Sequence, residues 1–586
     1  MNKPAAVKSN IVYAVDEKPP HLLSALLGFQ VVALILAGIV ITPIVALEAA
    51  GIDPSAGDWV VFAALFVSGL MTIVQAAPIG PIGAGYVLFM GTSGAFIAVS
   101  IGALEAGGLP LLGTLVATSS LIQFVFARHL GLFRKIVNPT VGGTVVTLIA
   151  VAVMPIAYNL LQATPADYTG PIEAPMWTAA VTLVLILGLS IFGSNKLRLW
   201  GPVIGVISGS LIAWWFGLAD LSRVSAAPLI GLPATGWPGL NLDFDSTYWL
   251  MLPGFMIVTI IGALETYGDG IAIQEVSHRT PPPTNFKTVQ GAVNADGVGN
   301  LISGLMGTLP NTTYSTSVSV ADLTGVAARR VGVYGGIILL LLAFSPKVSA
   351  ILQAIPGPVA GVFIFFLIVL LFAHGIRLIV SDGFSFDNGI VFGVAFWAGS
   401  GFQGLMVFHD LMPDAVSQLL DNGMTTGGIV AVILSYLVSL KRSKSYRSLV
   451  PSDLDGLSTA MEFITVRASA IGWRGEQLGR LQLALEEAFM FQIEIHADAD
   501  TDEFKTNVII RGDAQKIELE LISSLSGENL EGLIDGVKSS SDYSTQDLRL
   551  RILQSVADDI SHQQFNNADY LSLTLNAPVG LEPHVS

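Results

Sequence analysis

The chain contains no cysteine and few charged residues, and both absences narrow its class. Without cysteine it has no disulfides, no thiolate metal sites and no cysteine nucleophile. Only 12% of its 586 residues are charged, whereas soluble domains average roughly 25%. Hydrophobic residues make up 52%, and many apolar runs reach the ~20 residues that a bilayer span requires. The composition therefore predicts a polytopic α-helical membrane protein.

Motifs of catalysis are also missing from the apolar part of the chain. It contains no Walker loop, no histidines at metal-ligand spacing and no nucleophile elbow. We therefore expect no enzymatic activity, no catalytic residues, no metal and no cofactor. The N-terminal stretch 1–21 is polar and contains three prolines, and the apolar run after it is too long for a cleavable signal. We expect 1–21 to be a cytoplasmic tail and that run to be the first membrane span.

Fourteen apolar runs can be placed, and basic residues are distributed unevenly between them. The runs lie near 22–47, 58–77, 84–104, 109–127, 138–161, 175–193, 199–217, 248–272, 289–308, 314–327, 331–354, 357–380, 387–407 and 424–440. With the N-terminus in the cytoplasm, almost all basic loop residues fall on the cytoplasmic side, and Lys347 is the main exception. An even number of spans then places the C-terminus inside too. We expect a multi-pass protein of the cytoplasmic membrane with both termini in the cytoplasm.

The net charge of −16 is concentrated in the last quarter of the chain. From Pro451 onward there are 9 lysine and arginine residues against 23 aspartate and glutamate residues, a net charge of −14, which leaves −2 for everything before. We therefore expect a nearly neutral membrane domain at 22–440, a linker at 441–455 and an acidic α/β domain at 456–586. Anionic lipid and nucleic acid should repel that last domain.

Two stretches, 78–97 and 294–330, interrupt the apolar pattern. The stretch 294–330 is a candidate solute site. Its middle reads LPNTTY, in which Pro310 disfavours helix and the following residues favour an extended backbone. An interrupted helix in lipid exposes unpaired amides, so it survives where protein or a wet cavity covers it. The other stretch, 78–97, joins Pro-Ile-Gly-Pro to a short β-favouring segment. Their corresponding positions indicate two inverted seven-span repeats that meet at a midplane site, and a packed structural kink is the alternative.

Acidic residues inside the apolar runs are candidates for proton coupling, because isolated charges in a bilayer are costly. Glu265 and Asp269 are four residues apart and share one helix face. Two close carboxylates do not both ionise easily, which suits the uptake of one proton. Asp296 lies in the next run. We expect Glu265 to bind the solute and the two aspartates to couple the proton, and helix capping is the alternative for the aspartates.

The interrupted run after Pro310 carries hydroxyls and a further acid. One helix face groups Ser315, Ser319 and Asp322, and the half-helix starts at Thr316 and Ser317. Hydroxyls there can donate to or accept from a polar solute, and their other role is interhelical hydrogen bonding. Asp322 is either a third proton-coupling acid or the partner of a residue such as Arg329.

Four segments together carry a family resemblance. They are DGVGNLISGLMGTLPNTTYSTSVSVADLTGVAARRVG, LETYGDG, MGTSGAFI and IPGPVAGVF. They resemble the nucleobase–ascorbate transporter family, also called nucleobase:cation symporter-2, the xanthine and uracil permeases, over roughly residues 22–440. The resemblance implies fourteen spans, with spans 1–4 and 8–11 as a core domain and spans 5–7 and 12–14 as a gate domain. It also implies a homodimer, elevator-like alternating access and, as in many bacterial members, symport of a base with a proton.

The same resemblance assigns roles to individual residues. Glu265 holds the position of the substrate-binding glutamate of span 8, and Gln30 matches the glutamine of span 1. Asp269 and Asp296 match acids of xanthine-type members. We therefore expect the solute site to include Glu265, Gln30, Gly94, Ser315, Thr316 and Ser317.

The chain departs from the family pattern where a base would be recognised. The histidine that usually follows the span 1 glutamine is Val31, and the phenylalanine that stacks on the base in span 3 is Gly94. The span 10 pair of Glu or Gln followed by Asn is Thr316-Ser317, and the glycine after it is Ser319. Losing a buried hydrogen-bond partner costs roughly 1–3 kcal/mol, so we expect a bulkier or differently shaped purine rather than plain xanthine or uracil.

The C-terminal region alternates helix and strand patterns. LGRLQLALEEAFMFQIEIHA predicts an amphipathic helix, and TNVIIRG, KIELELISSL and YLSLTLN predict strands. The order resembles the ATPase fold of anti-sigma-factor serine kinases, whose helix needs a magnesium-ligating Asn four residues after Glu. Phe491 stands four residues after Glu487, Gln492 and His496 lie one residue late, and no clear Asp-x-Gly box is present. We expect weak or no ATP binding and a regulatory role, with a plain dimerising scaffold as the alternative.

The expected function is thus proton-coupled symport of a purine-like base. Two alternatives remain open. One is an anion carrier on the same scaffold, in which half-helix N-termini supply the binding charge. The other is a membrane sensor that relays solute occupancy to the C-terminal domain. The expected partners are a nucleobase-like solute, a proton, the lipid bilayer, a second copy of the chain and a cytoplasmic regulatory partner, and no nucleic acid.

Overall fold

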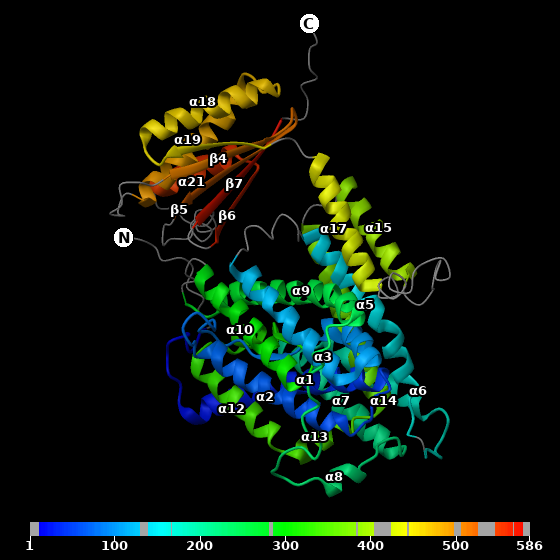
Figure 1. Cartoon of the computed structure of the whole chain (residues 1–586). Coiled ribbons are helices and arrows are strands. Elements are labelled where there is room, and N and C mark those ends of the chain that lie inside the picture. The colour runs from blue at the N-terminus through cyan, green and yellow to red at the C-terminus, as the bar shows by residue number, and fades with distance from the viewer. Residues whose placement is uncertain are drawn as a thin grey trace. The chain divides into compact units, whose positions relative to one another are not determined.

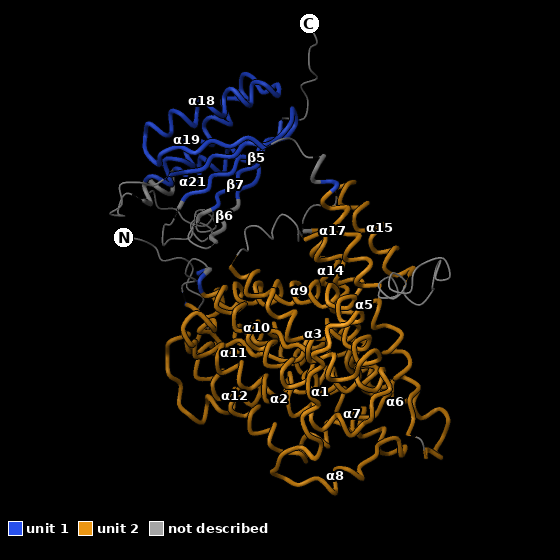
Figure 2. Tube along the Cα trace, viewed as in Figure 1, with its two compact units in different colours: residues 1–9, 279–287, 437–586 blue, residues 10–278, 288–436 orange. Residues whose placement is uncertain are grey.

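The computed structural model divides the chain into two compact units (Figures 1 and 2). One comprises residues 10–278 and 288–436, and the other comprises residues 1–9, 279–287 and 437–586. The structure describes residues 11–128, 139–165, 167–279, 285–381, 385–402, 423–441, 445–496, 505–524, 545–565 and 568–577.

The membrane domain consists of apolar helices joined mostly by short connections. They are α1 (His21–Ala49), α2 (Ala56–Ala76), α3 (Ile97–Arg128), α5 (Pro139–Leu161), α6 (Ala174–Phe192), α7 (Asn195–Trp215), α8 (Ser222–Ala226), α9 (Ser246–Val276), α10 (Phe286–Met306), α11 (Thr316–Thr324), α12 (Arg329–Ala343), α13 (Pro346–Gln353), α14 (Gly357–Ser381), α15 (Phe386–Phe402) and α17 (Gly423–Lys441). Among the described residues, eight helices are long and apolar enough to cross a membrane, or nine if the bent pair α12–α13 is one span. The prediction of a polytopic helical membrane protein is confirmed.

Helix length alone does not reproduce fourteen spans, although each predicted range overlaps a described helix or half-helix. The interrupted ranges contribute half-helices, of which α11 has nine residues. Gly108 has φ 65° and ψ −163°, so α3 is two helices joined across a break. The α10 helix contains Asn294, Asp296 and Asn300 and is correspondingly less apolar. The predicted count of fourteen therefore stays a prediction.

Glycine contacts let pairs of membrane helices approach backbone to backbone. A Cβ added at Gly143 of α5 would lie 2.5 Å from the carbonyl oxygen of Gly375 in α14. A Cβ at Gly69 of α2 would lie 2.8 Å from the carbonyl oxygen of Gly336 in α12. Helices in lipid associate through close packing of this kind, because lipid tails are as apolar as the side chains. These two pairs, α5 with α14 and α2 with α12, are the most extensive helix contacts in the domain.

The two interrupted ranges meet as a pair of short strands. β1 (Met90–Thr92) pairs antiparallel with β2 (Asn311–Thr313), so that Thr92 lies opposite Asn311. β1 leads into the 3-10 turn η1 (Gly94–Phe96) and then α3, and β2 leads into α11. The strand pairing supplies hydrogen bonds that an interrupted helix otherwise lacks. The predicted arrangement of a short strand followed by a half-helix is present in both ranges.

Residues 11–20, which we call the strap, lie across the connection between α11 and α12. The amide groups of Val12 and Tyr13 both donate to the Gly325 carbonyl, and the Arg329 amide donates to the Val15 carbonyl at 3.1 Å. Val15 is 2% exposed and packs in an apolar cluster with residues of α9, α10 and α11. The strap therefore bonds to the ends of α9 and α11 and to the start of α12.

A histidine and an ion pair lie beside the strap. The Tyr86 hydroxyl is 3.0 Å from Nε2 of His278, and Nη2 of Arg329 is 3.1 Å from Oδ1 of Asp16. Burial lowers the pKa of His278. The Asp16 carboxylate raises this pKa, and the Arg329 guanidinium lowers it further. The imidazole is consequently neutral near pH 7.

The C-terminal domain is a five-stranded antiparallel sheet with helices on one face (Figure 1). Its elements are β3 (Tyr446–Pro451), α18 (Leu454–Ala470), α19 (Glu476–His496), β4 (Lys505–Gly512), β5 (Lys516–Ser524), α21 (Thr545–Val556), β6 (Asp559–Phe565) and β7 (Ala568–Asn576). The strand order is β3-β4-β5-β7-β6. β3 lies within the predicted linker 441–455 yet pairs with β4 along its whole length, so the domain begins by residue 446 rather than 456.

Alternation along the strands builds the core of this domain. Val508 and Leu519 point inward from neighbouring strands, and Ile464 of α18 and Phe489 of α19 pack against them. Each is fully buried. The alternating strand patterns expected over β4, β5 and β7 are thus found, whereas β3, α18 and β6 were not expected.

Candidate functional site

The strand pair brings the beginnings of two half-helices to one place in the membrane domain. Because β1 and β2 are antiparallel, η1 begins beside the start of β2 and α11 begins beside the start of β1. Each helix N-terminus presents unpaired amide donors and a partial positive charge. A solute held between them would meet backbone donors from both halves of the chain.

Asp269 ties α9 to the junction between β2 and α11. Its carboxylate accepts hydrogen bonds from Oγ1 of Thr313 at 2.7 Å and from Oγ of Ser315 at 2.6 Å. Three residues earlier on α9, the Thr266 hydroxyl lies 3.2 Å from the Thr312 hydroxyl. Asp269 is 6% exposed and lies well inside α9, so it does not cap that helix.

Glu265, one turn before Asp269, has no partner among the described residues. Its side chain is partly exposed, and it forms no hydrogen bond or ion pair in the described part of the chain. The same region has room. A Cβ added at Gly94 would meet no atom within 4 Å, and two residues later the Phe96 ring packs 3.6 Å from a Cβ built at Gly262 of α9. An open space at Gly94 therefore lies where η1 packs against α9, about one helical turn before Glu265.

Asp296 is fully buried in α10 and is held by a neighbouring amide. Oδ2 accepts a hydrogen bond from Nε2 of Gln123 in α3 at 2.7 Å, and Oδ1 has no hydrogen-bond partner among the described residues. Gln123 accepts in turn from Asn300, which lies one turn after Asp296. Asp296 is far from either end of α10, so helix capping does not account for it.

The other predicted site residues are placed less directly. Ser317 is buried, and its hydroxyl accepts from the Phe89 amide at 2.9 Å, so it joins α11 to the residue before β1. Gln30 precedes Gly38, the α1 residue in contact with Tyr314, by eight residues, which is about 12 Å along a helix. Val31 and Val32, directly after Gln30, nevertheless pack in the same apolar cluster as Phe89, the residue before β1. The place of Gln30 in the solute site stays a prediction.

The exposed face of α11 carries Ser315, Thr316 and Asp322. Ser315 and Asp322 are exposed and Thr316 is partly exposed. The alternative pairing of Asp322 with Arg329 is not formed, because Arg329 pairs with Asp16 of the strap. Asp322 forms no hydrogen bond or ion pair in the described part of the chain.

The buried amides around Asp296 were missed by sequence reasoning. Gln123 and Asn300 are 0% and 2% exposed, and Asn311 at the start of β2 is 1% exposed. A signal was present, because a glutamine and an asparagine inside apolar runs require hydrogen-bond partners. Asn300 also follows Asp296 by four residues and so shares its helix face.

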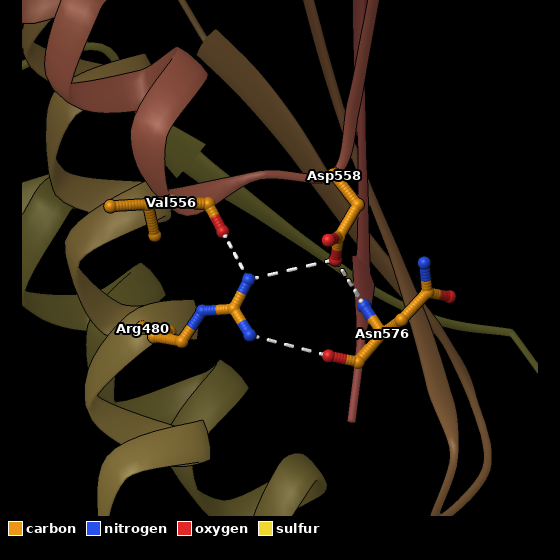
Figure 3. A network of polar contacts seen from close by, with 4 residues as sticks. All are labelled: Arg480, Val556, Asp558 and Asn576. Carbon is orange, nitrogen blue, oxygen red and sulfur yellow. Dashed lines mark hydrogen bonds and ion pairs between the residues drawn. The ribbon is translucent and has the colours of Figure 1, made fainter. Parts of the chain in front are cut away.

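In the C-terminal domain, Arg480 clamps the end of the sheet (Figure 3). Its guanidinium donates to the carbonyl groups of Val556 at 2.8 Å and Asn576 at 3.4 Å, and it lies 3.6 Å from Asp558. Asp558 in turn accepts from the Asn576 amide at 2.6 Å. These contacts join α19 to the α21–β6 connection and to the end of β7, which is a structural arrangement.

The positions at which a nucleotide-binding helix would hold magnesium are apolar or occupied. Phe491 is 1% exposed. Gln492 is buried without hydrogen bonds in the described residues, and the side chain of His496 is not among those described. Glu487 forms an ion pair of 3.1 Å with Arg549. A phenyl ring cannot coordinate a hard cation, so strict register offers no ligand here.

Comparisons with known proteins agree over the membrane domain. The profile of the Permease family, the xanthine and uracil permeases, matches residues 23–407. A putative purine permease of Clostridium perfringens is 29% identical over 429 residues, covering 73% of this chain and 92% of its own. A xanthine permease of Escherichia coli K12 is 28% identical over 444 residues, covering 73% and 95%. The inward-facing structure of murine Solute Carrier 26 family member A9, an anion transporter, aligns with a TM-score of 0.50 at 13% identity, covering 81% and 85%, and shares the fold.

Proposed function

This chain belongs to the Permease family, among the nucleobase–ascorbate transporters, and on that premise we propose that it carries a purine-like nucleobase across the cytoplasmic membrane. It is a transporter and not an enzyme. The names of its relatives, a purine permease and a xanthine permease, support this substrate class. Both termini and the C-terminal domain lie in the cytoplasm in this proposal, as the loop charges favour.

One observation carries the proposal. Glu265 is an acid inside a membrane helix that has no partner among the described residues, and it lies about one turn after Gly262, where α9 meets Phe96 of η1 and where Gly94 leaves open space. An unpartnered carboxylate in a membrane helix is costly unless a ligand or water satisfies it. Nucleobases offer adjacent N–H donors and carbonyl acceptors on one edge. The carboxylate of Glu265 accepts from the N–H groups, and backbone amides at Gly94 and Ser315–Thr316 donate to the carbonyl groups.

Asp269 and Asp296 supply the proton coupling in this proposal. Three carboxylates at 265, 269 and 296 are crowded into the site, and three negative charges together in a membrane are costly. A proton on one of them relieves that repulsion when the solute enters. Uptake should therefore increase as the outside pH falls, without a requirement for sodium.

The helix contacts support an elevator-type movement. The pairs α2–α12, α3–α9 and α1–α12 lie among the expected core spans, and α5–α14 and α6–α7 lie among the expected gate spans. In this mechanism the core carries the strand pair and Glu265 past the gate, and the gate provides the contact between two copies of the chain in a homodimer. The C-terminal domain acts as a regulatory module rather than an ATPase, because its expected magnesium position is a buried phenylalanine.

The direct test is uptake by the purified protein in liposomes. Labelled xanthine, urate, uracil and larger purines are compared with small carboxylates, with and without an inward proton gradient. We expect uptake of a purine that rises with the gradient, and we expect Glu265→Gln to abolish it. The matched control is Glu48→Gln, an exposed acid near the end of α1 that is not among the proposed site residues.

Each alternative predicts a different result in the same experiment. Uptake of carboxylates alone would identify an anion carrier. Thermal stabilisation by a base without any exchange across the membrane would identify a sensor. Ligand stabilisation increases with the logarithm of concentration, about 2.7 kcal/mol at 100 times the dissociation constant, so binding is detectable even when transport is absent.

A further inference from the structure

Two buried amide side chains connect Asp296 to the strand pair. The backbone N–H of Asn311 donates to Oδ1 of Asn300 at 2.6 Å, and Nδ2 of Asn300 donates to Oε1 of Gln123 at 3.0 Å. Nε2 of Gln123 then donates to Oδ2 of Asp296 at 2.7 Å. All four residues are at most 2% exposed. We call Gln123 and Asn300 the relay, because they form an unbroken path of hydrogen bonds between β2 and the acid.

The direction of the relay is fixed by its strand end. A backbone N–H can only donate, so Asn300 presents its oxygen to Asn311 and its NH₂ group to Gln123. Gln123 then presents its NH₂ group to Asp296. Oδ2 of Asp296 therefore always meets a donor, so a proton on this carboxyl group belongs on Oδ1. The Thr266 hydroxyl of α9 also acts on the carboxyl group and lies outside the relay.

The strength of the relay depends on the charge of the acid. A hydrogen bond to an ionised acceptor is about twice as strong as a neutral one, and aligned hydrogen bonds strengthen one another. With Asp296 ionised, the Gln123 bond is strong and polarises the two bonds behind it. A proton on Oδ1 removes the charge and weakens all three bonds together.

The far end of the relay is part of the solute site. Asn311 lies opposite Thr92 of β1, and two residues later Thr313 donates to Asp269. The Asn311 side chain also donates to the Ser68 hydroxyl of α2 at 3.0 Å. A change in the bond to the Asn311 amide therefore acts on the strand that positions the hydroxyl groups around Asp269.

We propose that Gln123 and Asn300 are positioning residues that transmit the protonation of Asp296 to β2, and this rests on the proposed proton-coupled transport. The ionised acid holds β2 in the observed position through the relay. Proton binding to Asp296 weakens the hydrogen bonds of the relay, so that β1 and β2 can shift position when the solute binds. Among the described residues, the charged groups that act on Asp296 are Glu265 and Asp269, both on α9.

The test compares two buried glutamines. Gln123→Met breaks the relay with little change of volume. Gln75→Met is the matched control, because Gln75 is equally buried and bonds to the Ala84 amide, the Ala292 carbonyl and the sulfur of Met90 in β1 without leading to an acid. Each variant is purified and placed in liposomes. Base uptake is measured across a pH series, and base exchange is measured at equal pH on both sides.

We expect Gln123→Met to move the midpoint of the uptake profile upward by about 1 pH unit, because the carboxyl group loses the donor that favours its ionised form. The rate of exchange should stay within about threefold of the unmodified protein, because Glu265 and its contacts with the base are unchanged. Loss of a charge-assisted hydrogen bond to the base itself would lower the rate by more than this. Asn300→Ala should move the midpoint in the same direction by a smaller amount. Gln75→Met should leave the midpoint unchanged.

An unshifted midpoint in Gln123→Met, with uptake lowered equally at every pH, would overturn the inference and leave the relay as interior packing. If Gln123→Met does not fold, Asn300→Ala decides by the same measurement, and an unshifted midpoint there has the same meaning. Failure of the proposed function is recognised separately, because the unmodified protein would then take up no base at any pH. The inference falls with it in that case.

Discussion

Replacing Gly94 by phenylalanine tests whether the open space in η1 is part of the solute site. A Cβ at this position meets no atom within 4 Å, and Gly94 is not among the glycines with positive φ, so a side chain is sterically and conformationally acceptable. The contrasting position is Gly91 in β1, where a Cβ would lie 2.7 Å from the Tyr314 ring. We expect Gly94→Phe to fold and Gly91→Phe to lose expression or stability.

The expected change in binding follows from the size of the ring. An aromatic pair contributes ~0.5–1.5 kcal/mol beyond the area it buries, which is about 2- to 12-fold in affinity. A flat base such as xanthine should therefore bind more tightly to Gly94→Phe by that factor. A purine with an additional substituent should bind more weakly, because the ring occupies the space that Gly94 leaves open.

The assay is the concentration dependence of thermal stabilisation by each ligand, with uptake in liposomes as a second readout. The Gly94→Ala variant is the control for the backbone, since it adds a methyl group and no ring. Equal affinities of Gly94→Phe and the unmodified protein for both ligands would refute the placement of Gly94 in the site. Tighter binding of the larger purine would refute the steric argument.

Three further outcomes are expected. Asp296→Asn should keep base exchange but lose acceleration by an inward proton gradient, because the amide cannot carry the proton, and unchanged acceleration in liposomes would exclude this role. Arg480→Met should destabilise the C-terminal domain by about 1–2 kcal/mol through lost bonds to two carbonyl groups, measured by hydrogen exchange over 446–577, while Lys516→Met, in an exposed pair, should cost under ~1 kcal/mol. Magnesium ATP should not raise the melting temperature of the full chain, because Phe491 is buried, and a shift that saturates at micromolar ATP would contradict that.

Local sequence chemistry predicted the elements around the strand pair. Pro310 and the hydroxyl residues after it indicated an extended segment, and β2 lies there. The acids at 265, 269 and 296 stood out because charge in an apolar run is costly, and the structure places all three near β2 or the helices beside it. These features depend on residues close together in sequence, which is why the sequence alone could indicate them.

Contacts between distant segments were not predictable in the same way. The register of β1 with β2 joins residues more than 200 positions apart. The hydrogen bond from the Phe89 amide to the Ser317 hydroxyl spans a similar distance in sequence. Gln30 was assigned to the site by resemblance alone, and the contact of its neighbours Val31 and Val32 with Phe89 also joins segments that are distant in sequence. β3 was assigned to a linker because a short polar edge strand has little apolar alternation of its own.

The strap has a consequence for the biosynthesis of the chain. The Gly325 and Arg329 groups to which residues 11–20 bond are translated more than 300 residues after them. At about 5–20 residues per second, translation separates the two by roughly 15–60 s. During that interval the amides of Val12 and Tyr13 and the carbonyl of Val15 lack their native partners. A fusion protein or affinity tag that folds directly in front of residue 11 would hinder this late docking of the strap. A tag joined through a long flexible linker would leave the strap free to bind once α12 has been made.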